Sequence, residues 1–70
     1  REVDARGLLC PWPALRLARE MRDHAQVAIL VDDPAAPAEL RQLAGQQGWD
    51  IAAADEDPRK FLVGDGKLPI

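Results

Sequence analysis

Apolar positions recur along the chain at two spacings, and each spacing predicts a type of secondary structure. Residues Glu2–Ala5 alternate between polar and apolar side chains, the pattern of a short half-buried strand. Val27–Val31 is an unbroken apolar run, typical of a strand that is covered on both faces or lies centrally in a sheet. Near the end, residues 49–54 alternate and residues 60–63 are again mostly apolar, so the two segments predict a hairpin. The inward side chains of its first strand should be Trp49, Ile51 and Ala53.

Two segments instead carry the helical spacing. From Pro11 onward, apolar side chains recur every three to four residues, which predicts an amphipathic helix ending near His24 with an inward face of Ala14, Leu17, Ala18 and Met21. Pro37 suits the first turn of a second helix, and Gly48 is a suitable C-terminal stop. Its inward residues should be Leu40, Leu43 and Ala44.

The order of these elements is β-α-β-α-β-β, which predicts an α/β fold, specifically an α+β two-layer sandwich. Right-handed crossovers would place both helices on one face of a four-stranded mixed sheet. With 70 residues, of which 47% are apolar and 30% charged, the chain suits one compact domain spanning residues 1–70.

Composition excludes several classes of function. One cysteine forms no intramolecular disulfide, and small domains from oxidising compartments usually carry several, so we expect a reducing, cytoplasmic location. Cys10, His24 and scattered carboxylates do not form a metal-ligand set, so we expect neither a metal nor a cofactor. No apolar stretch approaches membrane-spanning length. A net charge of -3 disfavours direct nucleic-acid binding, and we expect a monomer.

Candidate chemistry centres on the segment Leu9-Cys10-Pro11-Trp12-Pro13. With Pro11 at the first helical position, Cys10 becomes the N-cap, and Pro13 has no N–H to offer its sulfur. Only the N–H of Trp12 remains as a first-turn donor. The positive end of the helix dipole should favour the thiolate and lower the pKa of Cys10.

A purely structural role for Cys10 is the alternative, because free cysteine is often a small buried residue and prolines commonly begin helices. However, two prolines give up two N–H donors next to one sulfur, where serine or aspartate would cap a helix better. This arrangement favours a chemical role.

The chain resembles the TusA-type, or SirA-like, sulfur carriers. The likeness rests on Asp4-x-Arg6-Gly7-Leu8-x-Cys10-Pro11-x-Pro13 and on Asp32-Asp33-Pro34, and spans nearly the whole domain. The resemblance implies that Cys10 accepts sulfane sulfur as a persulfide from a cysteine desulfurase or rhodanese-like donor. It also implies relay to an acceptor protein, in transfer-RNA thiolation, cofactor synthesis or sulfur oxidation, with Pro11, Pro13 and Arg6 supporting the cysteine.

Other residues allow two interpretations each. Trp12 either docks a partner or covers an edge of the core, and Trp49 is expected in the core. Arg6 either stabilises an anionic persulfide or is solvated, and Asp33 either orients the Cys10 loop or caps the second helix. His24 lies too far along the helix to act on Cys10. A set of basic residues forms either a partner-binding face or ordinary solvated surface: Arg16, Arg19, Arg22, Arg59 and Lys60.

Two other functions remain open from the sequence. One is a non-covalent regulatory or protein-binding module in which Cys10 is inert. The other is RNA binding, because the predicted fold resembles the C-terminal domain of a translation initiation factor, although the acidic net charge opposes it.

Overall fold

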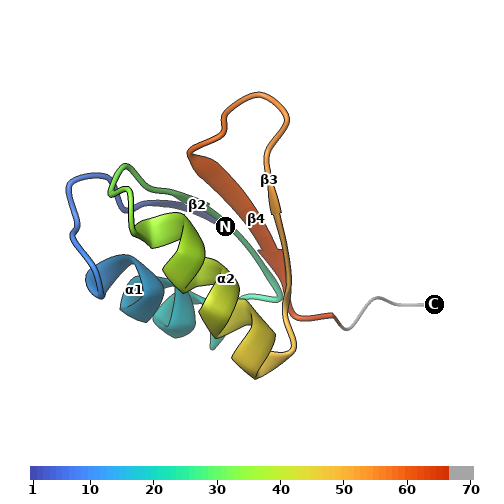
Figure 1. The fold of residues 1–70 in the computed structure, drawn as a ribbon. Helices are drawn as coiled ribbons and strands as arrows, with labels where there is room; N and C mark the ends of the chain where they lie inside the picture. Colours follow the sequence, from blue (N-terminus) through green and yellow to red (C-terminus); the bar gives the residue numbers. More distant parts are fainter. Residues whose placement is uncertain (67–70) are drawn as a thin grey trace.

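The computed structural model describes residues 1–66 and places four strands in one mixed sheet in the order β1-β2-β4-β3. The parallel pair is β1 with β2, and the antiparallel pairs are β2 with β4 and β3 with β4. Both helices, α1 and α2, lie on one face of this sheet (Figure 1). The strands are β1 (Glu2–Asp4), β2 (Gln26–Leu30), β3 (Asp50–Ala53) and β4 (Lys60–Gly64); the helices are α1 (Trp12–Met21) and α2 (Ala36–Gln47). This arrangement confirms the predicted fold class. The predicted domain spans residues 1–70, and its last four residues, 67–70, lie outside the part of the chain that the structure describes.

The core fills the space between the sheet and the helices. Strand β2 lies between β1 and β4, and its residues alternate between buried and partly exposed. The sequence predicts either a strand covered on both faces or a central strand, and the central position is correct. Its buried side chains, Val27 and Ile29, point toward the helix layer, while the opposite face of the sheet carries no helix (Figure 1). Removing such apolar surface from water is the main favourable term in folding. The largest fully buried side chains are Leu17, Ile29, Leu40, Val31 and Pro13.

The end of the first helix differs from the predicted one by a few residues, and the end of the second agrees with it. Helix α1 ends at Met21, before the predicted end near His24, and the N–H of His24 still bonds the Glu20 carbonyl at 3.1 Å within the turn that leads to β2. Helix α2 ends as predicted at Gly48, which adopts the left-handed conformation with φ 75° that glycine tolerates best. The N–H of Trp49 donates a hydrogen bond to the Ala44 carbonyl at 2.9 Å, which satisfies a carbonyl group at this end of the helix.

The predicted alternation of the first hairpin strand is partly wrong. Trp49 and Ile51 are half-buried and pack against the core as expected, but Ala53 is exposed and Ala54 is buried. Ala54 follows the end of β3, and its N–H bonds the Lys60 carbonyl at 2.8 Å where the chain begins its turn. The change of direction there reverses which side chain faces inward. Within residues 1–66, neither helix combines the length and apolar content needed to cross a bilayer.

Candidate functional site around Cys10

The loop between β1 and α1 carries the candidate nucleophile. After β1, the N–H of Ala5 bonds the Leu30 carbonyl at 2.8 Å, and Gly7 then turns the chain with φ 84°. This is the sharp glycine turn that the sequence predicts, since other residues rarely adopt a positive φ. Cys10 lies at the end of the loop and is exposed, so the alternative of a buried structural cysteine is wrong.

Two adjacent aspartates after β2 hold this loop. The Asp32 carboxylate accepts the N–H of Gly7 at 2.9 Å, and the Asp33 carboxylate accepts the N–H of Cys10 at 2.8 Å. Asp33 also accepts the N–H of Ala35 at 3.2 Å, just before α2. Of the two predicted roles of Asp33, orienting the Cys10 loop is the one that the structure shows. The predicted capping of the second helix is wrong, because the N-cap residue of α2 is Ala35 and no side chain caps this end. The segment from Asp4 to Pro13 and the segment Asp32-Asp33-Pro34 are thus joined by hydrogen bonds.

Helix α1 begins one residue later than predicted. Pro11, not Cys10, is the N-cap residue, and Pro13 occupies the second helical position and is buried. The N–H of Trp12 donates to the Leu9 carbonyl at 2.8 Å and so is not directed at the sulfur. The predicted capping of the helix by the Cys10 sulfur is therefore wrong. The thiol lies just outside the helix, where the helix dipole acts on it from a greater distance.

Glu39 of α2 contributes to raising the pKa of the Cys10 thiol. A hydrogen bond from the thiol to the Glu39 carboxylate is the largest cause that raises the pKa of Cys10, followed by desolvation and by the negative charges of Glu39 and Asp33. The predicted lowering of this pKa is wrong, because two carboxylates oppose the partial positive charge of the helix end. Sequence reasoning missed Glu39, since an acidic residue in a first helical turn is common and its spacing from Cys10 carries no signal.

Arg6 is held by Asp4. The guanidinium donates to the Asp4 carboxylate through Nε at 3.0 Å and Nη2 at 2.8 Å, and the Arg6 N–H donates to the same group at 3.1 Å. These hydrogen bonds lower the pKa of Asp4 to about 2. Arg6 therefore stabilises the base of the loop.

Three large apolar side chains within five residues of Cys10 are exposed. Leu9, Trp12 and Leu15 are 68%, 59% and 53% exposed, and we refer to these three residues as the apolar rim. Of the two predicted roles of Trp12, docking is favoured over covering an edge of the core, because more than half of this side chain is exposed.

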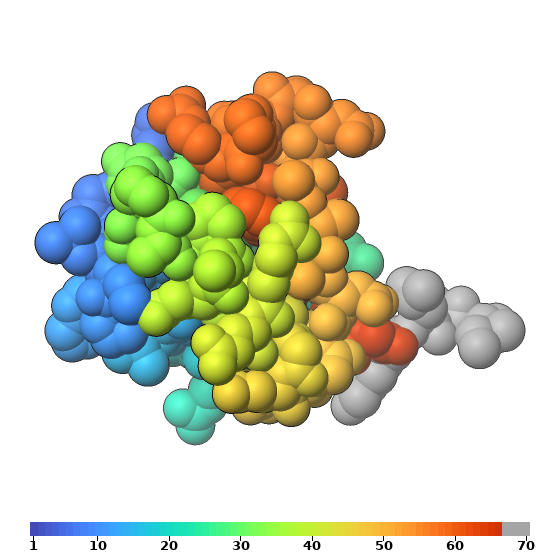
Figure 2. Space-filling model, viewed as in Figure 1, coloured from blue at the N-terminus to red at the C-terminus, as the bar shows by residue number. Residues whose placement is uncertain are grey.

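A shallow groove of about 290 Å³ runs beside the apolar rim, between the two helices. Figure 2 shows the corresponding contact between the blue start of α1 and the green start of α2. The groove is lined by Pro11, Ala14, Glu39, Gln42, Leu43 and Gln46.

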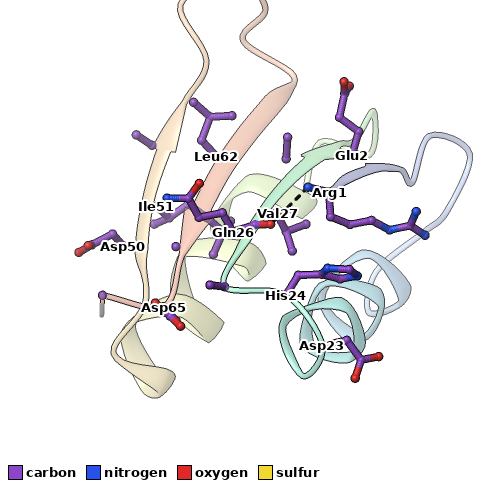
Figure 3. A pocket seen from close by; sticks show the side chains of 16 residues that line it. Arg1, Glu2, Asp23, His24, Gln26, Val27, Asp50, Ile51, Leu62 and Asp65 are labelled. Atoms are coloured by element: carbon purple, nitrogen blue, oxygen red, sulfur yellow. Dashed lines mark hydrogen bonds between the residues drawn. The ribbon is translucent and has the colours of Figure 1, made fainter. Parts of the chain in front are cut away.

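A larger hollow, of about 860 Å³, lies on the open face of the sheet. Its lining includes His24, Gln26 and Leu62, and no residue from Arg6 to Trp12 contributes to it (Figure 3). His24 approaches Glu20 at 4.0 Å and lies away from the Cys10 loop, as expected.

Most of the predicted basic set is neutralised within the chain. Arg16 pairs with Glu20 at 3.0 Å, Arg59 lies 3.5 Å from Asp57, and Lys60 lies within reach of Glu2 and Glu56 at 3.5 and 3.6 Å. These pairs favour the interpretation of an ordinary solvated surface over that of a basic binding face.

Comparisons with known proteins agree with this geometry. The family model described as "Sulfurtransferase TusA" matches residues 1–63. The crystal structure of a SirA-like protein from Desulfitobacterium hafniense is 26% identical, covers 89% of each chain and superposes with a TM-score of 0.69. No curated protein sequence matches the chain significantly.

Proposed function

Because the chain belongs to the TusA sulfurtransferase family, a family of sulfur carriers, we propose that Cys10 accepts a sulfane sulfur as a persulfide and relays it to an acceptor protein. The observation that carries this proposal is the exposed Cys10, whose backbone N–H is held by Asp33 and whose chain neighbours include the exposed residues of the apolar rim. A side chain placed in this way can enter the active site of another protein.

The transfer needs no external oxidant or reductant. In loading, the Cys10 thiolate attacks the outer sulfur of a persulfide on the donor, the sulfur–sulfur bond breaks, and the donor cysteine leaves as a thiolate with the electron pair. In unloading, an acceptor thiolate attacks the outer sulfur on Cys10, which leaves as a thiolate. Pro11, Pro13 and Arg6 support both steps by shaping the loop and the start of α1.

The partners are proteins that bring the sulfur to the loop. We propose a cysteine desulfurase or rhodanese-like donor, in a reducing cytoplasm, and an acceptor in transfer-RNA thiolation, cofactor synthesis or sulfur oxidation. The apolar rim supports docking because its side chains lose water-exposed area when another protein covers them.

Intact mass spectrometry tests the proposal. The chain is incubated with a cysteine desulfurase and cysteine, and we expect a mass gain of one sulfur atom that a thiol reductant reverses. Cys10→Ser is the control and should remain unloaded while keeping the parent's circular dichroism spectrum. A parent chain that stays unloaded with both a desulfurase and a rhodanese-like donor would favour a non-covalent module with an inert cysteine.

A further inference from the structure

The sheet face opposite the helices carries apolar side chains at its centre. Outward positions on an uncovered sheet face are normally polar. The alternation of β4 buries Phe61 and Val63 and leaves Leu62 outward, 48% exposed. The register places Ala28 of β2 and Ala52 of β3 directly opposite Leu62. One large apolar side chain therefore lies between two small ones in the middle of the open face.

The small side chains leave a hollow of about 860 Å³ beside Leu62, and we refer to it as the sheet hollow (Figure 3). Among residues 1–66, both helices lie on the other face of the sheet, so neither covers it (Figure 1). An apolar floor of this kind is stabilised when side chains from another surface enter the hollow and displace water. A helix with one apolar stripe fits such a face, because it would add a third layer to the two-layer sandwich.

The border of the sheet hollow is acidic. Four carboxylate residues contribute to its lining: Glu2, Asp23, Asp50 and Asp65. Glu2 lies 3.5 Å from Lys60, whereas Asp23 and Asp50 are exposed and have no ion-pair partner among residues 1–66. Negative charge therefore remains around the apolar floor.

This charge determines which kind of partner fits the sheet hollow. The basic residues of its lining, Arg1 and His24, lie 3.0 and 4.0 Å from the Glu20 carboxylate and so do not offset the border. A second copy that docked through the same face would bring like charges together, which disfavours association. Nucleic acids and anionic lipids are disfavoured for the same reason. The complementary surface is a basic one.

We propose that the sheet hollow binds a basic amphipathic helix of a partner protein, with the apolar side chains of that helix over Leu62 and its lysine or arginine side chains beside the acidic border. No residue from Arg6 to Trp12 lines the sheet hollow, so such a partner leaves the Cys10 loop uncovered. A carrier held by this face can still present its thiol to a donor and to an acceptor. The binding site is separate from the proposed relay and does not depend on it.

A titration of the isotope-labelled chain followed by NMR tests the proposal. The probe is a synthetic helical peptide with leucine on one face and lysine on the other. The amide shifts should be largest in β2, β3 and β4, the strands that contribute most of the lining, and small in the Cys10 loop. Affinity should fall when the salt concentration is raised about tenfold, and a peptide with glutamate in place of lysine should not bind.

Two variants separate the apolar and the electrostatic contributions. Leu62→Gln should bind the lysine peptide at least about fivefold more weakly than the parent. Its matched control is Leu15→Gln, because Leu15 is similarly exposed, at 53%, but belongs to α1 on the other side of the sheet. Asp50→Asn should bind about twofold more weakly. Asp55→Asn removes the same charge from the exposed turn after β3, outside the lining, and should match the parent.

Equal affinity of Leu62→Gln and Leu15→Gln, or the largest shifts on α1, would overturn the proposal. A glutamate peptide that binds as tightly as the lysine peptide would also overturn it. A dimer in sedimentation that Leu62→Gln abolishes would show that a second copy occupies the hollow, and would overturn it as well. These measurements use no sulfur donor, so failure of this proposal and failure of the relay are distinguishable.

Discussion

Replacing Asp33 with alanine tests whether the two sequence motifs act as one unit. The Asp33 carboxylate accepts from the N–H of Cys10 at 2.8 Å and from that of Ala35 at 3.2 Å, and so connects the loop after β1 to the start of α2. Alanine removes both acceptors. The Cys10 N–H then has only water as a partner, and the loop loses its attachment next to the nucleophile.

The expected loss in the free energy of unfolding follows from the number of these hydrogen bonds and from their exposure to water. A hydrogen bond to a charged acceptor contributes about 1.5–3 kcal/mol, and both bonds lie near the surface, where water competes, so we take about 1 kcal/mol for each. For a domain of this size, 1 kcal/mol shifts the melting temperature by about 4–8 °C. Asp33→Ala should therefore melt about 10 °C below the parent, and Asp33→Asn, which keeps one oxygen acceptor, about 5 °C below.

Thermal unfolding at neutral pH measures the loss of stability, and hydrogen exchange at the Cys10 amide localises it. Asp23→Ala serves as the control because Asp23 is exposed and its carboxylate has no hydrogen-bond partner among residues 1–66. If Asp33→Ala melts within about 2 °C of the parent and its Cys10 amide stays protected, the carboxylate does not hold the loop.

Three further outcomes are expected. Trp12→Ala should keep the parent's melting temperature to within about 2 °C, since the side chain is 59% exposed. Its loading by a protein donor at limiting concentration should fall at least about tenfold, and equal loading would exclude Trp12 from docking. Pro13→Ala should lose about 2 kcal/mol in urea unfolding, because the ring is fully buried; a loss under about 0.5 kcal/mol would contradict that packing. Arg6→Gln should be less stable than the parent at neutral pH. The difference should disappear as pH falls from the ordinary Asp4 value of 3.8 through about 2, and one that persists in acid would show that the ion pair is not its source.

The secondary structure could be predicted because its signals are local. The spacing of Leu17 and Met21 defines one face of α1, and the apolar run from Val27 defines β2, without knowledge of any distant residue. Gly7 and Gly48 fulfil their predicted turn and stop because a positive φ is a property of one residue and its immediate neighbours. The order of these elements leaves few compact arrangements, so the two-layer sandwich also follows.

The exact start of α1 could not be predicted in the same way. Proline is suited to the first helical position, but tertiary packing buries Pro13 and turns Pro11 into the N-cap. The single-residue shift moves the thiol outside the helix. Local propensity distinguishes such neighbouring positions poorly, because helix ends depend on the packing of the whole turn.

By itself, the sequence determined the elements, their order and Cys10 as the candidate nucleophile, because periodicity, turn residues and a rare cysteine–proline pattern are all written within short segments. Only the tertiary structure decided the electrostatic setting of that cysteine. Packing of the start of α2 beside the Cys10 loop brings in Glu39 and reverses the expected direction of the thiol's pKa. Electrostatic interactions depend on distance in space, and no local pattern around Cys10 or Glu39 encodes their proximity.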